Sequence, residues 1–242
     1  YRYTWIRDTT FTLQALHYLN LDWQADEFMQ FVADLEPNPD GALQIMYSIE
    51  GPRDLKESIR DELSGYEGAR PVRIGNGAAL HSQHDIYGEM VLALTPIFLD
   101  ERMSAERSPA ALRLIEELAR KAISLAGVPD AGIWEYRTEW KPQTFSSLMC
   151  WAAADRMAGI ADRHAPARAA EFHSAANRIH TEVIAQSWNA SKGSFVGHYG
   201  GEDLDASLLQ MVRLRFLPAR DPKLSSTIDA IHKDLARGAW LQ

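Results

Sequence analysis

The sequence contains one cysteine, no long apolar run and no excess of basic residues, and each absence excludes a class of protein. A single thiol, Cys150, cannot form a disulfide within the chain. The longest apolar runs, such as Met90–Leu94, are far shorter than the roughly 18 residues that a membrane-spanning helix requires. The formal net charge is −8, and no clustered basic face is recognisable for nucleic-acid binding. We therefore expect neither a membrane nor a nucleic-acid partner.

The composition that remains is that of a globular protein. The chain has 242 residues, of which 46% are hydrophobic and 24% charged, so it can bury a substantial core. No signal-peptide pattern opens the sequence, which predicts a cytoplasmic location. Cys150 lies in the apolar run Leu148–Trp151 and is expected in the core. The sequence leaves the oligomeric state open.

Apolar spacing predicts an all-α protein built of antiparallel helix pairs. Asp8 is the predicted N-cap of the first helix, and alternation through Leu43, Ile45 and Tyr47 predicts a short strand. The predicted helices cover residues 11–19, 28–35, 78–99, 109–125, 145–160, 167–188, 204–216 and 225–235. The pairs share no sequence period, so we expect a closed or curving array with functional loops on one face rather than a regular solenoid.

A long polar segment ends in the glycine-rich stretch Gly65–Gly77. Its four glycines permit close backbone approach and positive φ, which makes it a candidate binding loop or, alternatively, an irregular connection. It has neither the Walker spacing nor the strand, turn and helix pattern of a dinucleotide site. We expect no cofactor.

His81, His84 and Asp85 fall within one predicted helix at spacings that could serve metal ligands. No further histidine or cysteine repeats the pattern, so we do not expect a metal site here.

The stretch Gly132–Arg137 is the strongest candidate for chemistry. It places Glu135 between the bulky apolar residues Ile133, Trp134 and Tyr136, with Arg137 two positions on. Apolar neighbours remove hydration from a charged carboxylate, so Glu135 would stay protonated near neutral pH, as a general acid must. The alternative is that Glu135 caps a surface turn or forms a salt bridge beside Arg137.

Several motifs in one order then resemble glycoside hydrolase family 15, which contains glucoamylases, glucodextranases and some bacterial trehalases. The resemblance covers nearly the whole chain. It rests on Tyr3–Asp8, Arg70–Ala79, Asp85–Glu89, Gly132–Glu135, His198–Gly200 and Leu204–Ser207. It implies a single partial domain over residues 1–242, an (α/α)6 barrel incomplete at both ends. The implied activity is inverting release of glucose from the non-reducing end of a small or oligosaccharide α-glucoside.

The resemblance also implies roles for individual residues. Glu135 matches the general acid, and Trp134 the tryptophan before it. Arg7 and Asp8 match the pair that holds hydroxyl groups of the terminal glucose. Trp5 matches an aromatic wall, and Arg70 an arginine beside the cleavage point, while Arg137 is a further candidate substrate contact. Tyr136 stands where fungal glucoamylases have a second acidic residue, so the resemblance does not fix the leaving sugar.

An inverting mechanism needs a second carboxylate, the base, roughly 6.5–9.5 Å from the acid. In the family that glutamate follows a segment like Ala236–Trp240, which places it beyond Gln242. We therefore expect a chain that lacks the base to be inactive alone.

Three functions remain open after this reading. A glucoamylase-like α-glucosidase is the leading hypothesis, and an α,α-trehalase of the same family is the close alternative. A non-catalytic carbohydrate-binding or scaffold protein is the alternative from another class. An unrelated helical toroid such as a terpene cyclase is disfavoured, because no D-D-x-x-D metal motif occurs.

Overall fold

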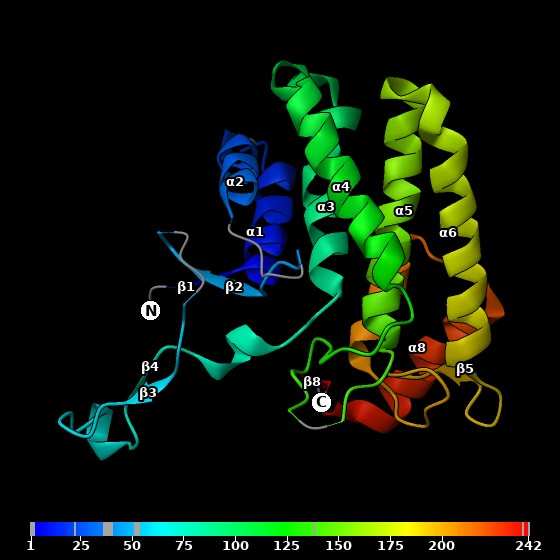
Figure 1. Ribbon diagram of the computed structural model, residues 1–242. Coiled ribbons are helices and arrows are strands. Elements are labelled where there is room, and N and C mark those ends of the chain that lie inside the picture. Colours follow the sequence, from blue (N-terminus) through cyan, green and yellow to red (C-terminus); the bar gives the residue numbers. More distant parts are fainter. Residues whose placement is uncertain are drawn as a thin grey trace. The chain divides into compact units, whose positions relative to one another are not determined.

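The computed structural model describes residues 3–21, 23–35, 41–50, 54–137, 139–238 and 240–241. Its internal contacts divide the chain into two compact units, Tyr1–Ser82 and Gln83–Gln242. Helices dominate the chain, which confirms the predicted all-α class (Figure 1). None of the helices in the described ranges is long and apolar enough to cross a membrane.

The first unit combines two helices with two short two-stranded antiparallel sheets. Its elements are β1 (Tyr3–Trp5), α1 (Ile6–Tyr18), α2 (Trp23–Asp34), β2 (Met46–Ser48), β3 (Ser58–Ile59), η1 (Tyr66–Gly68), β4 (Arg73–Ile74) and η2 (Gly77–Leu80). Strand β1 pairs with β2, and β3 pairs with β4. The predicted short strand is thus present, and its hydrogen-bonded part lies at Met46–Ser48.

The start of α1 differs from the prediction. The N-cap is Trp5, and Asp8 lies in the first turn, so the assignment of Asp8 as N-cap was wrong. The reason is the pairing of β1, which continues directly into the helix: the Ile6 amide donates to the Ile45 carbonyl at 2.9 Å. The side-chain hydroxyl of Thr9 then donates to the Trp5 carbonyl at 2.9 Å, within the first turn.

The second unit is a group of long helices with shorter elements after them. Its elements are α3 (Asp85–Leu99), η3 (Glu101–Glu106), α4 (Pro109–Leu125), α5 (Thr144–His164), α6 (Pro166–Ser187), β5 (Trp188–Asn189), β6 (Ser194–Phe195), η4 (Ala206–Leu209), α7 (Gln210–Leu214), α8 (Pro222–Leu235), β7 (Ala236–Arg237) and β8 (Trp240–Leu241). Helices α3, α4, α5 and α6 run side by side (Figure 1).

Helix α5 lies at the centre of this unit. It packs against α3, α4 and α6, and most of its residues are buried, including Cys150 as predicted. Helix α4 is amphipathic and begins where its sequence directs. The Ser108 hydroxyl accepts from the Ala111 amide at 3.0 Å, and Pro109 occupies the first turn, where a missing N–H costs nothing.

Two predicted helices are shorter than expected. The one predicted at 78–99 begins at Asp85, because Asn76 caps a separate 3-10 turn, η2, and His81 is extended. His81 therefore does not share α3 with Asp85, and that part of the prediction was wrong. The helix predicted at 204–216 is divided between η4 and the single turn α7, since Asp205 caps the first and Arg215 ends the second in a left-handed conformation.

Candidate active site

Three of the predicted sugar-binding residues lie together in the first unit. Trp5 ends β1, and Arg7 and Asp8 follow in the first turn of α1. Trp5 and Arg7 are half-buried and Asp8 is exposed. The antiparallel pairing of β1 with β2 holds the start of this turn, and an aromatic ring, a guanidinium and a carboxylate occur within these four residues of chain.

Arg70 lies elsewhere in the same unit, between η1 and β4 on the arm that β3, η1 and β4 form. It is exposed, and its Nη1 donates to the Asp61 carbonyl at 3.4 Å. Gly65, Gly68 and Gly75 of this arm have positive φ, as the sequence predicted, whereas Gly77 does not. The assignment of the arm as a binding loop stays a prediction.

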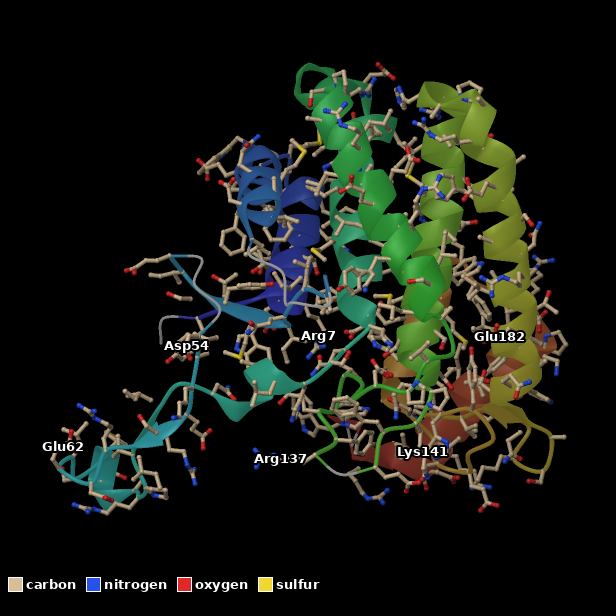
Figure 2. The ribbon with its side chains drawn as sticks, viewed as in Figure 1. Arg7, Asp54, Glu62, Arg137, Lys141 and Glu182 are labelled. Carbon is tan, nitrogen blue, oxygen red and sulfur yellow. The ribbon has the colours of Figure 1, made fainter. Side chains whose placement is uncertain are left out.

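In the second unit, Glu135 is carried by the loop between α4 and α5, which also bears Arg137 and Lys141 (Figure 2). The base of the loop is closed by backbone pairing, because the Asp130 amide donates to the Lys141 carbonyl at 3.2 Å. Inside it, the amides of Glu135 and Tyr136 donate back to Gly132 and Ala131 at 3.1 and 2.9 Å. Glu135 thus sits on a tight, internally bonded turn.

Glu135 has a left-handed backbone, with φ of 57°. For a residue with a side chain this conformation is costly, and such residues are concentrated at functional sites. Glu135 is half-buried as a residue, and within the described ranges neither Glu135 nor Arg137 forms an ion pair. The reading of Glu135 as a partner of Arg137 in a surface salt bridge therefore finds no support.

The expected apolar enclosure of Glu135 is only partly present in this unit. Ile133 is half-buried, but Trp134 and Tyr136 expose 57% and 48% of their surfaces. The indole of Trp134 has a polar partner of its own, since its Nε1 donates to Oδ2 of Asp205 at 3.1 Å.

Gly132 is required at the start of the turn. Its φ is +63°, and an added Cβ would come within 2.8 Å of the Gln143 side chain, which is buried at the start of α5. Both the backbone conformation and the close contact favour glycine. The glycine of the motif thus brings the Glu135 turn against the core.

Asp205 is a residue of this site to which the sequence analysis assigned no role. It is buried, and besides the Trp134 indole it accepts from the Ser207 amide at 2.8 Å as N-cap of η4. Asp205 did occur in one of the motifs of the family resemblance. Its partner, however, lies 71 positions away, so only the fold could identify the contact.

A buried polar group supports the base of the Glu135 loop. Asp130 accepts from the His84 amide at 2.8 Å and from the Ser146 hydroxyl at 2.7 Å. Burial raises the pKa of Asp130 to about 7, against the effect of these hydrogen bonds, and the nearby charge of Asp85 adds to the increase. Burial also lowers the pKa of the His84 imidazole to about 4.

These acidic and histidine side chains do not form a metal centre. Among the described residues, no three His, Cys, Asp or Glu side chains are grouped so as to hold a metal ion. The structure brings together Trp134, Glu135 and Arg137 in one unit and Trp5, Arg7 and Asp8 in the other. Convergence of these two sets with Arg70 at one end of a barrel stays a prediction.

Comparison with known proteins decides the family. The sequence model described as "Glycosyl hydrolases family 15" matches residues 1–241. The chain belongs to glycosyl hydrolase family 15. The family resemblance predicted from the motifs is confirmed, and the motifs that contain Trp5, Glu135 and Asp205 all lie within the matched range.

Relatives of this family 15 chain include proteins named trehalase. The trehalase of Mycolicibacterium smegmatis is 42% identical over 240 residues, which cover 97% of this chain and 35% of the relative. The trehalase of Thermoplasma volcanium is 35% identical over 242 residues, covering 100% of this chain and 38% of the relative. The chain therefore spans little more than a third of the length of these curated relatives.

Solved structures of glycosidases have a similar fold. A glycosidase variant in complex with glucose superposes with a TM-score of 0.71 at 19% identity, over 99% of this chain and 62% of that one. A wild-type glycosidase gives a TM-score of 0.68 at 19% identity with the same coverage. At this identity the likeness concerns the fold, and the chain has the fold of a portion of an (α/α)6 barrel.

Proposed function

We propose that the whole protein carrying this chain is an inverting α-glucoside hydrolase that acts on trehalose, with Glu135 as its general acid. The observation that carries the proposal is the position of Glu135. Its carboxylate has no ion-pair partner among the described residues, and it sits on a left-handed turn that backbone hydrogen bonds hold against the helical core. Such a group can donate a proton to a bound glycosidic oxygen without first breaking a salt bridge.

Trehalose is favoured over starch-type substrates by the relatives. Proteins named trehalase match nearly the whole chain at up to 42% identity. Tyr136 agrees with this choice, because it replaces the second acidic residue found next to the acid in fungal glucoamylases. The trehalase alternative thus replaces the glucoamylase-like hypothesis as the preferred function, and the non-catalytic alternative has no observation in its favour.

In the proposed reaction, Glu135 protonates the oxygen that joins the two glucose units as that bond breaks. A water molecule attacks the anomeric carbon from the opposite face, and a second carboxylate accepts its proton. The attacked glucose leaves as the β-anomer and the other as the α-anomer. The second carboxylate is the glutamate expected beyond Gln242.

The remaining predicted site residues suit the recognition of a sugar. Aromatic rings stack on the apolar faces of pyranose rings, while charged side chains bond to vicinal hydroxyl groups as donors and acceptors. The side chains that we propose for this purpose are Trp5, Arg7, Asp8, Arg70, Trp134 and Arg137.

The test is the dependence of Glu135→Gln on the leaving group. A general acid matters most when the leaving oxygen is a poor anion, so in the whole protein we expect kcat for trehalose to fall by about 100-fold or more. Hydrolysis of α-glucosyl fluoride, whose leaving group needs no proton, should be largely retained. Initial rates on both substrates, with NMR detection of the anomers, measure this difference.

Glu139→Gln is the matched control, because Glu139 is an exposed glutamate on the same loop, beside Lys141 at 4.0 Å. It should leave both rates unchanged. Equal losses on trehalose and on the fluoride in Glu135→Gln would contradict the role of Glu135 as acid and assign it a structural role.

A further inference from the structure

Trp134 exposes much of its indole to solvent, yet a buried carboxylate holds its ring nitrogen. The indole Nε1 donates to Oδ2 of Asp205 at 3.1 Å, and Asp205 is only 8% exposed. A hydrogen bond to a charged acceptor is stronger than one between neutral groups. An exposed side chain would otherwise change rotamer freely, so this bond selects one orientation of the ring.

Asp205 is itself firmly attached to the helical core. Its other oxygen, Oδ1, accepts from the Ser207 amide at 2.8 Å and so caps η4, whose Leu208 is buried. Two residues before it, the Asp203 carbonyl accepts from the Gly197 amide at 2.8 Å. The Gly197 carbonyl in turn accepts from the amide of Thr144, the first residue of α5, at 2.9 Å.

The turn that follows Trp134 needs such an attachment. Glu135 has a φ of 57°, and a residue keeps a costly backbone conformation only when its surroundings determine it strongly. The backbone bonds to Gly132 and Ala131 hold the turn from one side. The indole bond of Trp134 to Asp205 is a further attachment of the turn, because Trp134 adjoins Glu135 directly in the chain.

We propose that Asp205 is a positioning residue for the reaction. It fixes Trp134 and, through it, the left-handed turn that presents the carboxyl group of Glu135 to the leaving oxygen. This role rests on the proposed function of Glu135. The two carboxylate oxygens of Asp205 accept from Trp134 and Ser207, and the positioning role requires no contact between Asp205 and the sugar.

Asp205→Asn separates this role from the capping of η4. Asparagine is as good an N-cap as aspartate, and its single carbonyl oxygen can still accept from the Ser207 amide. The second position then carries an NH2 group, which faces the indole N–H as donor against donor. The variant should therefore fold and lose only the bond to Trp134.

The matched control is Asp221→Asn. Asp221 caps α8 in the same way, with Oδ1 accepting from the Lys223 amide at 2.8 Å, and it has no contact with Trp134. This variant should behave as wild type in every assay below.

The first readout is the indole N–H spectrum of the whole protein, in which Trp134→Phe identifies the signal of Trp134. In Asp205→Asn we expect that signal alone to move upfield, as a lost bond to a carboxylate requires. An unmoved signal would overturn the proposal, whatever the protein hydrolyses.

The second readout is turnover of trehalose, or of whichever α-glucoside the wild-type protein hydrolyses, against α-glucosyl fluoride. A misplaced acid lowers kcat, so Asp205→Asn should reduce kcat on the sugar about tenfold or more with KM little changed. The loss on the fluoride should be smaller. In a Trp134→Phe background, Asp205→Asn should cause no further change in the ratio of the rate on the sugar to the rate on the fluoride.

If Asp205→Asn left kcat unchanged, or lowered the rates on both substrates equally, the positioning role would be overturned. This would hold even if the spectrum had shown the hydrogen bond between Trp134 and Asp205. A wild-type protein that hydrolyses no α-glucoside would contradict the proposed function together with the positioning role. The spectrum would then still decide the bond between Trp134 and Asp205, so the two failures are distinguishable.

Discussion

At the scale of single residues, folding raises the pKa of the Asp130 carboxyl group and lowers the pKa of the His84 imidazole. The two residues are neighbours, because the backbone amide of His84 donates to the Asp130 carboxylate. The pKa of Asp130 rises from 3.8 to about 7 on folding, chiefly through burial. The folded state therefore holds this proton longer than the unfolded state does. The stabilisation from Asp130 is complete below pH 3.8 and is lost as the pH rises towards 7.

His84 has the reverse dependence. Burial is the largest cause of the decrease of its pKa from 6.5 to about 4, the positive charge of Lys121 adds to it, and a hydrogen bond with the Val128 backbone opposes it. Its stabilisation is complete above pH 6.5 and is lost as the pH falls towards 4. Between pH 4 and 6.5 the two residues thus offset each other, so their combined contribution changes little.

Asp130→Asn should expose this compensation. In the variant only His84 still makes stability depend on pH. Its free energy of unfolding, relative to that of wild type, should therefore rise as the pH increases from 4 to 6.5. The relative slope should reach at most about 1.4 kcal/mol per pH unit, the value for one proton. Urea unfolding followed by circular dichroism at several pH values measures it. Parallel curves for the two proteins would contradict the opposed titrations.

Hydrogen bonds between residues far apart in the chain could not be predicted from the sequence. Glu135 could be proposed as the acid from the sequence because its apolar and glycine neighbours are adjacent to it. The bond of Trp134 to Asp205 and that of the His84 amide to Asp130 join positions 71 and 46 apart. No local pattern specifies such partners, since the packing of α3, α5 and η4 selects them.

At the scale of elements, α3 and α5 approach each other closely at Gly88. A Cβ at this position would lie 2.2 Å from the Met149 carbonyl oxygen and 2.8 Å from its Cβ. The obstacle is helix backbone, which cannot yield as a flexible side chain would. The glycine in the Asp85–Glu89 motif therefore sets how near α3 lies to α5.

Gly88→Ala should destabilise the protein by about 1–3 kcal/mol, because the two helices must separate. Gly159→Ala is the matched control, since Gly159 lies within α5 and has open space at its Cβ position. That variant should be neutral or more stable by up to about 1 kcal/mol, as helix propensity dictates. Chemical denaturation of both variants measures the difference. Equal stabilities would show that the contact at Gly88 can relax.

Element boundaries were predictable where the sequence itself caps the helix. Helix α4 begins at Pro109 and ends at Leu125 as predicted, and α5 and α6 differ from their predicted bounds by a few residues. The start of α1 was missed because β1 pairs with β2, a strand more than 40 residues away. The start of α3 was missed because the Asn76 side chain stabilises a competing 3-10 turn.

At the scale of the whole molecule, the chain spans 35% of the trehalase of Mycolicibacterium smegmatis and 38% of that of Thermoplasma volcanium. The family resemblance predicts that the catalytic base lies outside this chain. An acid without its base can protonate a leaving group but cannot activate the water on the opposite face.

The 242-residue chain alone should therefore release no glucose from trehalose or maltose, whereas the protein extended through the downstream helices should turn over. Glucose release by material free of host glycosidases, with circular dichroism to establish that it is folded, makes this comparison. Production of β-glucose by the 242-residue chain would place a base among its own residues and refute the assignment beyond Gln242.

The backbone pairing of Asp130 with Lys141 closes the loop of Glu135 at its base, and this pairing involves no side chain near Tyr136. Substitutions at the tip of the loop therefore need not disturb helices α4 and α5 on either side of it. Substitution around Tyr136 could then alter the preferred leaving group during evolution while the acid kept its support. The loop thus combines a paired base with an exposed tip, and libraries confined to Tyr136, Arg137 and Trp140 are the natural starting point for altering the glucoside preference that we propose.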